Sequence, residues 1–248
     1  MRMFSIDLNC DLGEGMGTDA AIMPYISSAN IACGYHAGDQ QTMSETVGLC
    51  TRNSVAIGAH PSFDDRENFG RKEQSVSTVE IRALITKQLE ILSREAEKQG
   101  ARLHHVKPHG ALYNQSAKNI SVARAIAEAV RDFDPQLVIY GLSGSHSVYE
   151  ARALGLRAAS EVFADRTYQD DGTLTPRGRP EALVENVQGA VQQALHLVKD
   201  SMVRTISGKE LLLVADTICL HGDGKQAVRV ARAIFEALKR EDIIIMKI

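Results

Sequence analysis

The sequence predicts one α/β domain over residues 1–248, folded as a closed or nearly closed barrel of seven parallel strands. Two patterns support this prediction. Strand-like and helical segments alternate along the chain, and the strand-like runs end in polar side chains followed by glycine or proline. A length of 248 residues also suits a single α/β barrel. Because spacing does not report whether a sheet closes, an open doubly wound sheet is the alternative.

The expected strands are short apolar runs, and the helices between them have apolar residues at helical spacing. The strands lie at residues 5–9, 29–33, 55–59, 103–107, 137–141, 158–163 and 217–221, with an additional short strand at 211–215. The helices lie at 42–51, 79–99, 121–133, 145–154, 180–199 and 225–239. The longest helix has Ser77 or Thr78 as its N-cap and Gly100 just after its end.

Composition argues against several classes of protein. The net charge is −3 and the basic residues are scattered, which is not typical of a nucleic-acid-binding surface. No apolar run approaches the length of a membrane span, and the first residues lack the apolar segment of a signal peptide. The four cysteines form no CxxC pair, which predicts reduced thiols. We therefore expect a cytoplasmic protein with a small-molecule substrate and no nucleic-acid or membrane partner.

The first candidate cluster lies where the first strand runs into a glycine-rich turn. It consists of Asp7, Asn9, Asp11 and Glu14. A charge inside an apolar strand is costly unless it is paired, ligated or used, so Asp7 is hard to explain as a loop residue. Asp11 and Glu14 have a simpler alternative as turn residues that cap backbone amides. In β/α barrels the functional groups follow the C-terminal ends of the strands, so the cluster predicts one wall of a pocket.

Imidazoles follow the next two strands. His36 lies in a turn between Gly34 and Gly38, and His60 directly follows the strand at 55–59. Together with Asp11, the carboxylate from the first strand, His36 and His60 are compatible with a two-histidine, one-carboxylate site for a divalent metal. The same side chains are equally compatible with a hydrogen-bonded acid–base set that needs no metal. The sequence leaves both open.

Three later strand ends complete the predicted pocket. Lys107 ends the fourth strand, and His109 lies in the turn after it. A lysine buried at a strand end suits stabilisation of an oxyanion or a bound phosphoryl group. Glu161 is the expected inward-facing group of the sixth strand, and His221 ends the seventh.

Several familiar motifs are absent. The sequence contains no Walker A loop, no GxGxxG dinucleotide fingerprint and no GxSxG nucleophile elbow. The adjacent His104 and His105 look like a metal motif, but strand alternation points them to opposite faces. Cys10 and Cys33 lie near the predicted pocket, but free cysteine is usually a small buried apolar residue rather than a nucleophile.

Taken together, the motifs resemble the LamB/YcsF family. The resemblance rests on residues 7–15, 28–39, 58–63, 70–71, 106–114, 161–166, 171–174 and 218–223, which follow one another along most of the chain. It implies a β/α barrel of the glycoside hydrolase/deacetylase type. It also implies ATP-dependent opening of 5-oxoproline (pyroglutamate) to L-glutamate, together with two partner subunits. Two positions depart from the family pattern: Gln40 replaces a usual proline, and Gly224-Lys225-Gln226 replaces a typical Thr-Pro-Gly.

A mechanism follows from this resemblance and from the missing nucleotide loop. We expect partner subunits to consume ATP by phosphorylating the lactam oxygen, after which this chain hydrolyses the activated ring. Asp11 or His36 would act as base and His60 or His109 as acid, while Lys107, Arg66 and Arg71 would bind the phosphoryl group. The catalytic set is Asp7, Asp11, His36, His60, Lys107 and His109, and the substrate-binding set is Asn9, Glu14, Arg66, Arg71, Glu161 and His221.

Two alternatives from other classes remain open. One is a metal-dependent amide or sugar N-deacetylase that uses Asp11, His36 and His60 and needs neither ATP nor partners. The other is a lactam-binding subunit with no catalytic role of its own.

Overall fold

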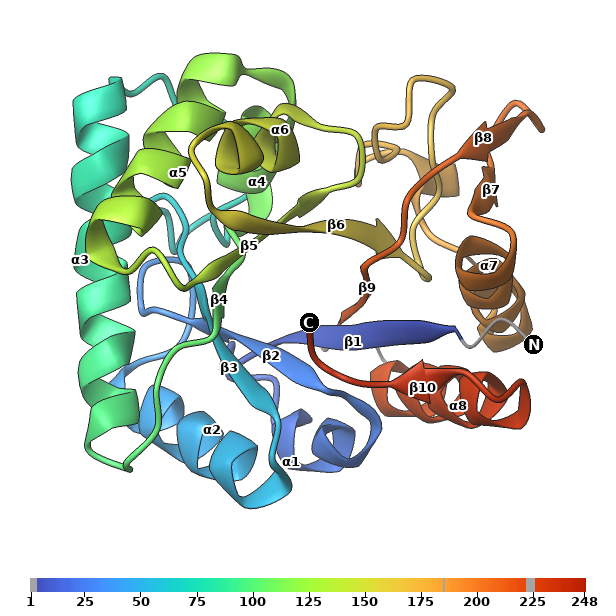
Figure 1. Cartoon of the computed structure of the whole chain (residues 1–248), viewed down its shortest axis with the longest axis horizontal. Coiled ribbons are helices and arrows are strands. Elements are labelled where there is room, and N and C mark those ends of the chain that lie inside the picture. The colour runs from blue at the N-terminus through green and yellow to red at the C-terminus, as the bar shows by residue number, and fades with distance from the viewer. Residues whose placement is uncertain (1–3, 185, 222–225) are drawn as a thin grey trace.

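Seven parallel strands close into a barrel, because the first strand pairs with both the second and the last (Figure 1). The computed structural model describes residues 4–184, 186–221 and 226–248. The order around the ring is β1 (Ser5–Leu12), β2 (Ser28–Ala32), β3 (Ala56–His60), β4 (His105–Val106), β5 (Val138–Leu142), β6 (Arg157–Phe163) and β9 (Thr217–His221). The predicted barrel is confirmed, and the open sheet is excluded.

The helices lie outside the ring of strands (Figure 1). They are α1 (Asp19–Ile22), α2 (Gln40–Asn53), α3 (Thr78–Glu97), α4 (Gly110–Lys118), α5 (Ile120–Phe133), α6 (His146–Ala153), α7 (Val187–Lys199) and α8 (Ala227–Arg240), with short 3₁₀ turns η1 (Met23–Tyr25) and η2 (Pro180–Ala182). An antiparallel hairpin of β7 (Met202–Arg204) and β8 (Glu210–Leu212) precedes β9, and β10 (Ile244–Ile245) pairs with the start of β1. Among the described helices, none is both long and apolar enough to cross a membrane.

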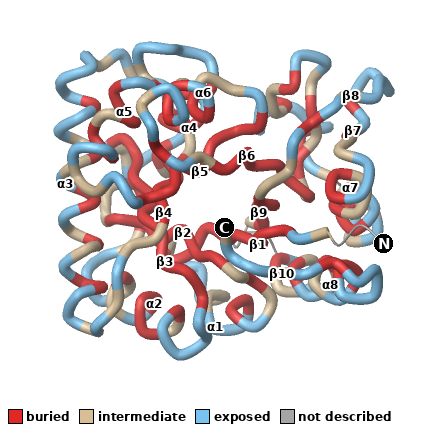
Figure 2. The backbone as a smooth tube through the Cα atoms, in the orientation of Figure 1, coloured by how far each residue is buried: buried red, intermediate tan, exposed pale blue. Residues whose placement is uncertain are grey.

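Most residues of the barrel strands are buried (Figure 2). The two faces of the strands nevertheless differ in chemistry. On β1, Leu8 and Leu12 belong to the hydrophobic core that the strands share with the helices. Asp7, Asn9 and Asp11 alternate with them and contact residues of other strands across the barrel interior. The interior of this barrel is therefore a stack of hydrogen-bonded polar groups rather than layers of aliphatic side chains.

The C-terminal segment covers the end of the barrel at which the strands begin (Figure 1). Ile248 packs against Val138 and Tyr140, and its backbone oxygen lies 2.9 Å from Nε2 of His104. His105 stacks on Tyr140, with ring centroids 4.1 Å apart, and its Nδ1 lies 3.3 Å from Nδ1 of His104. The predicted opposite orientation of the two histidines is therefore wrong: their rings contact each other, and strand alternation does not apply to His104 because β4 begins at His105. With this end covered, the other end of the barrel is the one available for ligands.

The predicted elements are correct in kind more often than in their limits. β1 extends three residues past its expected end, because Asp11 and Leu12 still pair with neighbouring strands. The segment predicted as one helix over 180–199 contains η2 and then α7. The strand expected at 211–215 lies at β8, and α4 was missed because its helix starts directly at the His109–Gly110 turn.

The ends of the longest helix agree with the sequence. Ser77 caps α3 in a reciprocal capping box with Glu80, and Gly100 follows the helix with a φ of 69°. The helix predicted from residue 225 begins at Ala227, and residue 225 itself lies outside the described part of the chain.

Replacement of Gly58 by alanine tests the packing of the barrel interior. A Cβ atom at this position would overlap the imidazole of His105 on the neighbouring strand, and that ring is held between Tyr140 and Asn30. We expect Gly58→Ala to lower the free energy of unfolding by about 1–3 kcal/mol or more, measured by urea denaturation.

Gly178→Ala is the matched control, since nothing lies within 4 Å of its Cβ position and its backbone is ordinary. We expect it to change the free energy of unfolding by less than about 0.5 kcal/mol. Equal effects of the two substitutions would contradict the packing described here.

Candidate functional site

A cavity of about 350 Å³ opens at the C-terminal ends of the strands. This is the end at which the sequence predicted the pocket. Its ionisable lining residues include Asp11, Glu14, His60, Arg71, Lys107, His109, Arg166, Arg177 and His221. The lining combines carboxylates, imidazoles and guanidinium groups, which is the mixture that a polar, anionic small molecule requires.

Lys107 is the centre of the buried charge in this site. Its Nζ lies 2.8 Å from Oδ1 of Asp11 and 2.8 Å from Oε1 of Glu161. It also lies 3.0 Å from Sγ of Cys219 and 3.3 Å from Oδ1 of Asn9. An ammonium group has three protons, so these four neighbours account for all of its donors. Lys107 therefore ties together strands β1, β6 and β9 from the end of β4.

The charges in this group stabilise each other. Burial by itself would lower the pKa of Lys107, but Asp11, Cys219 and Glu161 outweigh burial and hold its pKa well above the usual range. Burial would raise the pKa of Asp11, but His60 and Lys107 outweigh it and hold that pKa well below the usual range. Asp11 is thus a carboxylate and Lys107 an ammonium at neutral pH.

Two asparagines continue this network toward the covered end of the barrel. Asn30 donates from Nδ2 to Asp11 at 2.8 Å and to Oδ1 of Asn9 at 2.7 Å. Asn9 donates in turn to Glu161 at 2.9 Å, and His105 lies 2.8 Å from Oδ1 of Asn30. Because each amide is held on both sides, the orientation of Asp11 is fixed by the layer beneath it.

Asp7 lies deeper still and does not line the cavity. Its carboxylate accepts hydrogen bonds from the hydroxyls of Ser27 (2.6 Å), Ser28 (2.7 Å) and Thr217 (2.6 Å). Burial raises its pKa, and these hydrogen bonds oppose the rise. The structure thus separates Asp7 from the other residues of the predicted catalytic set.

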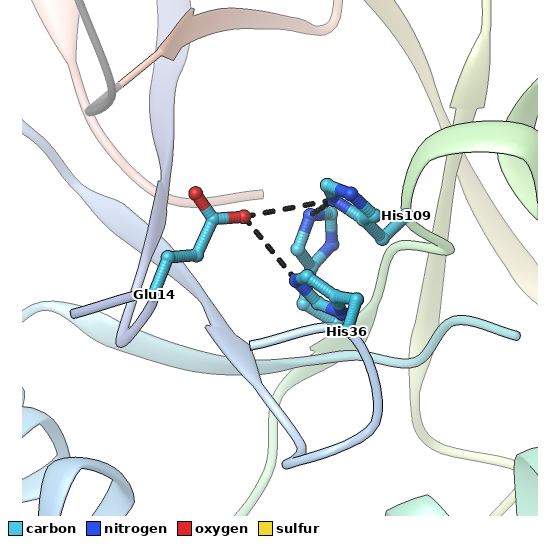
Figure 3. Close-up of side chains that lie close together, drawn as sticks. Glu14, His36 and His109 are labelled. Atoms are coloured by element: carbon cyan, nitrogen blue, oxygen red, sulfur yellow. Dashed lines mark hydrogen bonds and ion pairs between the residues drawn. The ribbon is translucent and has the colours of Figure 1, made fainter. Parts of the chain in front are cut away.

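Three imidazoles and a carboxylate form a compact cluster at the cavity wall. Figure 3 shows Glu14 pointing at His36 and His109, with its Oε1 3.3 Å from Nε2 of His36 and 3.6 Å from Nδ1 of His109. His36 and His109 stack with ring centroids 3.8 Å apart, and Nδ1 of His109 lies 2.9 Å from Nε2 of His60. His36 follows β2, His60 ends β3 and His109 precedes α4, so the barrel order brings these residues together.

Burial keeps two of the three imidazoles, His36 and His109, neutral. It lowers the pKa of His36 to about 2, with the neighbouring His60 acting in the same direction. It also holds the pKa of His109 well below the usual range, again with His60 contributing. At neutral pH neither His36 nor His109 carries a proton on both ring nitrogens.

His221 ends β9 as the register partner of Asp11 on β1, and it is paired with a further carboxylate. Its Nδ1 lies 2.8 Å and 3.0 Å from the two carboxylate oxygens of Asp165, which follows β6. Burial would raise the pKa of Asp165, but His221 outweighs it and lowers that pKa. Sequence reasoning assigned no role to Asp165, although it follows a strand in the same way as the other site residues.

The arginines fall into two groups. Arg71, Arg166 and Arg177 line the cavity, and Arg166 donates to the backbone oxygens of Ala182 and Thr175. Arg66 donates to the backbone oxygens of Gly34 (3.0 Å) and Gly38, and among the described residues it is not part of the lining. Arg66 therefore holds the turn that carries His36. The sequence did not predict a role for Arg177. It lies in a long loop, and the charged composition of that loop was the only feature that could have indicated a ligand-binding residue.

The cysteines are buried and free in the described structure. Burial raises the pKa of Cys33 to about 12 and holds the pKa of Cys219 well above its usual range. These thiols are protonated at neutral pH, which disfavours a cysteine nucleophile.

Comparison with known proteins decides the family. Residues 6–248 match the model of the LamB/YcsF family. The chain belongs to the LamB/YcsF family. The A subunit of a 5-oxoprolinase from Bordetella pertussis is 51% identical over 246 residues, which cover 97% of this LamB/YcsF chain and 98% of that protein.

Solved structures agree with this assignment. The crystal structure of a lactam utilization protein from Thermus thermophilus matches with a TM-score of 0.92 and 40% identity, covering 99% of this chain and 100% of that one. The peptidoglycan deacetylase PdaC from Bacillus subtilis matches with a TM-score of 0.52 and 14% identity, over 99% and 88% of the two chains. At that identity PdaC shows a shared fold alone, and this fold is the deacetylase-type barrel that the resemblance implied.

The structure describes one of the two departures from the family pattern in full and the other only in part. Gln40 starts α2 and donates to Glu95 of α3 at 3.0 Å, so this position links two outer helices away from the cavity. The other departure includes Gly224 and Lys225, which lie outside the described residues.

The buried His105 predicts a pH dependence of stability. Burial, followed by His104 and Lys107, holds its pKa well below the usual range. Below about pH 6.5 the unfolded chain binds a proton that folded His105 does not, so stability falls as the pH falls. We expect His105→Gln to make the slope of unfolding free energy against pH shallower by up to about 1.4 kcal/mol per pH unit between pH 6.5 and 5.

Tyr140→Phe is the control for this measurement, since it alters the ring stacked on His105 without removing a group that titrates in this range. It should shift the stability curve and leave its slope unchanged. A slope that is the same in His105→Gln and the wild type would contradict the prediction.

Proposed function

We propose that this chain is the A subunit of a 5-oxoprolinase and hydrolyses the lactam of 5-oxoproline to L-glutamate. The observation that carries the proposal is the 51% identity over 97% of the chain with a protein of that name. The cavity supports it, because a volume of about 350 Å³ suits a small ligand. Its mixed charges also match a substrate that has one carboxylate and one amide.

Opening of the lactam ring consists of three bond changes. The oxygen of water must bond to the ring carbonyl carbon, the bond from that carbon to the ring nitrogen must break, and the nitrogen must leave with a proton. Amide resonance makes the carbon a poor electrophile, so phosphorylation of the lactam oxygen by ATP would activate it. Loss of the ring nitrogen then leaves an acyl phosphate, and a second water molecule releases inorganic phosphate from it to give L-glutamate. Since the sequence contains no nucleotide-binding loop, we place the use of ATP on partner subunits.

We assign the proton transfers to His221. The carboxylate of Asp165 accepts a hydrogen bond from Nδ1–H of His221, which fixes the tautomer and stabilises the ring when it becomes an imidazolium. Nε2 is then the basic nitrogen, and no described residue hydrogen-bonds it. His221 lines the cavity, so it can take a proton from the attacking water and pass it to the departing nitrogen.

We assign the anionic groups of the substrate to Arg71 and Arg177, because both line the cavity and guanidinium groups bind carboxylate or phosphoryl oxygens in pairs. The donors of Lys107 are directed at Asp11 and Glu161. Its proposed role is therefore to hold Asp11 at the cavity wall rather than to meet the phosphoryl group itself.

The activity prediction concerns His221. In the complex reconstituted with its partner subunits, we expect His221→Gln to slow glutamate formation from 5-oxoproline and ATP by at least about 100-fold, because the proton acceptor is lost. Asp165→Asn should also slow it strongly, since the tautomer is no longer held. Glutamate is measured directly, and ATP hydrolysis is followed in parallel.

His196→Gln is the control, because this histidine lies on α7 with a 38% exposed side chain. It should leave the rate unchanged. If the wild-type chain forms no glutamate with its partners, the proposed function is wrong. If the wild-type complex forms glutamate and His221→Gln retains full activity, the assigned base is wrong.

The second candidate is an amide hydrolase that acts without ATP. The cluster of Glu14, His36, His60 and His109 favours it, because such a set of ligands is able to hold a divalent metal. An assay with and without ATP and partners separates the two candidates: glutamate formed by the isolated chain without ATP supports the second.

A further inference from the structure

The three clustered imidazoles each have one nitrogen whose proton is already assigned by an outer partner. Nδ1 of His60 lies 2.7 Å from the backbone oxygen of Lys107, and Nε2 of His109 lies 2.9 Å from the backbone oxygen of Phe69. A carbonyl oxygen only accepts hydrogen bonds, so these two nitrogens carry the protons.

The same reasoning applies to His36 through a hydroxyl. Its Nδ1 lies 2.9 Å from Oγ of Ser62, and that hydroxyl donates its single proton to the backbone oxygen of Phe63 at 2.9 Å. Ser62 can therefore only accept from His36, which places the proton of this ring on Nδ1.

The remaining nitrogens of the three rings all face one point. They are Nε2 of His36, Nε2 of His60 and Nδ1 of His109, and with a carboxylate oxygen of Glu14 they lie within 4.8 Å of one another. In neutral rings these are lone pairs. Two of them, on His60 and His109, are only 2.9 Å apart, which is unfavourable unless a positive charge lies between them.

We propose that Glu14, His36, His60 and His109 bind one divalent first-row transition metal ion, with zinc as the reference case. Three imidazole nitrogens and one carboxylate oxygen form a ligand set typical of zinc. The outer hydrogen bonds to carbonyl and hydroxyl oxygens are the contacts by which proteins orient metal-binding histidines. This ligand set differs from the one expected from the sequence, in which Asp11 is the carboxylate: Oδ1 of Asp11 is engaged by Lys107 and Asn30, and its Oδ2 lies 3.5 Å from Nε2 of His60.

The site lies beside the cavity in which we place the lactam. His60, His109 and Glu14 line that cavity, whereas His36 is not among the described lining residues. A metal here would offer a positive charge to the carbonyl or phosphoryl oxygen of a bound substrate. The alternative on the same geometry is a proton on Nε2 of His60 that is shared with His109 or directed at Oδ2 of Asp11, which makes one of the rings an imidazolium.

Metal binding is measured on the isolated full chain, stripped with a chelator and titrated with zinc, and cobalt(II) reports the ligands by its visible absorption. We expect one equivalent of zinc and an intense four-coordinate cobalt spectrum. His36→Ala and His109→Ala should weaken zinc binding by more than about 100-fold, beyond the 10–100-fold typical of outer-contact substitutions. Ser62→Ala should weaken it by about 10–100-fold through loss of the tautomer.

Two further variants separate the proposed ligand set from the alternative built on Asp11. Glu14→Gln should weaken zinc binding and change the cobalt spectrum, whereas Asp11→Asn should retain one equivalent. His196→Gln, on the surface, should bind as the wild type does. Circular dichroism checks that each variant is folded. If a histidine variant fails to fold, Ser62→Ala still tests the proposal, because it removes no ligand.

Three results would overturn the proposal. They are a folded chain that binds no zinc, zinc binding that survives His36→Ala and His109→Ala, and loss of binding in Asp11→Asn but not in Glu14→Gln. The first of these would leave the shared proton as the explanation of the short contact. Because no substrate, ATP or partner is present, failure of this test is distinct from failure of the proposed hydrolase function.

Discussion

The ion cluster around Lys107 is the interaction on which the rest of the site depends. One ammonium group, buried in the barrel, contacts two carboxylates from the two strands that flank β9, Asp11 on β1 and Glu161 on β6. Each charge would be costly alone in this interior, and removal of one partner from such a group typically costs about 3–5 kcal/mol. The cluster therefore fixes the relative positions of strands that lie far apart in the sequence.

Asp11 has different neighbours at its two carboxylate oxygens. Its Oδ1 contacts Lys107, and its Oδ2 lies 3.5 Å from Nε2 of His60, next to the imidazole cluster. The closure that joins β1 to β9 also makes His221 the register partner of Asp11, so the pair of His221 and Asp165 lies at the neighbouring strand ends. The proposed hydrolysis uses this pair for proton transfer, and the proposed metal occupies the imidazole cluster.

Much of this could be predicted from the sequence, because the signal was local. Alternating segments predicted the barrel, and polar residues at strand ends marked the open face, including Asp11, His60, Lys107 and His221. Depth within the barrel was not predictable. Asp7 and Asp11 have the same side-chain direction on β1, and only the register with β2 and β9 shows that Asp7 lies below the cavity.

Pairings between distant segments were equally hidden. Nothing in the sequence couples Ser62 to His36 or Asp165 to His221, since these contacts depend on how the loops pack after the barrel has closed. The expected role of Lys107 illustrates the same limit. Its type and position suggested a cation for the substrate, whereas its neighbours show that its donors are already used within the protein.

The central claim is that the site is organised by charge pairing at Lys107. The most direct test compares the unfolding free energy of Lys107→Met with that of the triple variant Lys107→Met, Asp11→Asn, Glu161→Gln. We predict a loss of about 3–5 kcal/mol for the single substitution, because two carboxylates are left without their cation. The triple variant should recover most of that loss, since no buried charge of the cluster remains. A single variant as stable as the wild type, or a triple variant no more stable than the single one, would contradict the account.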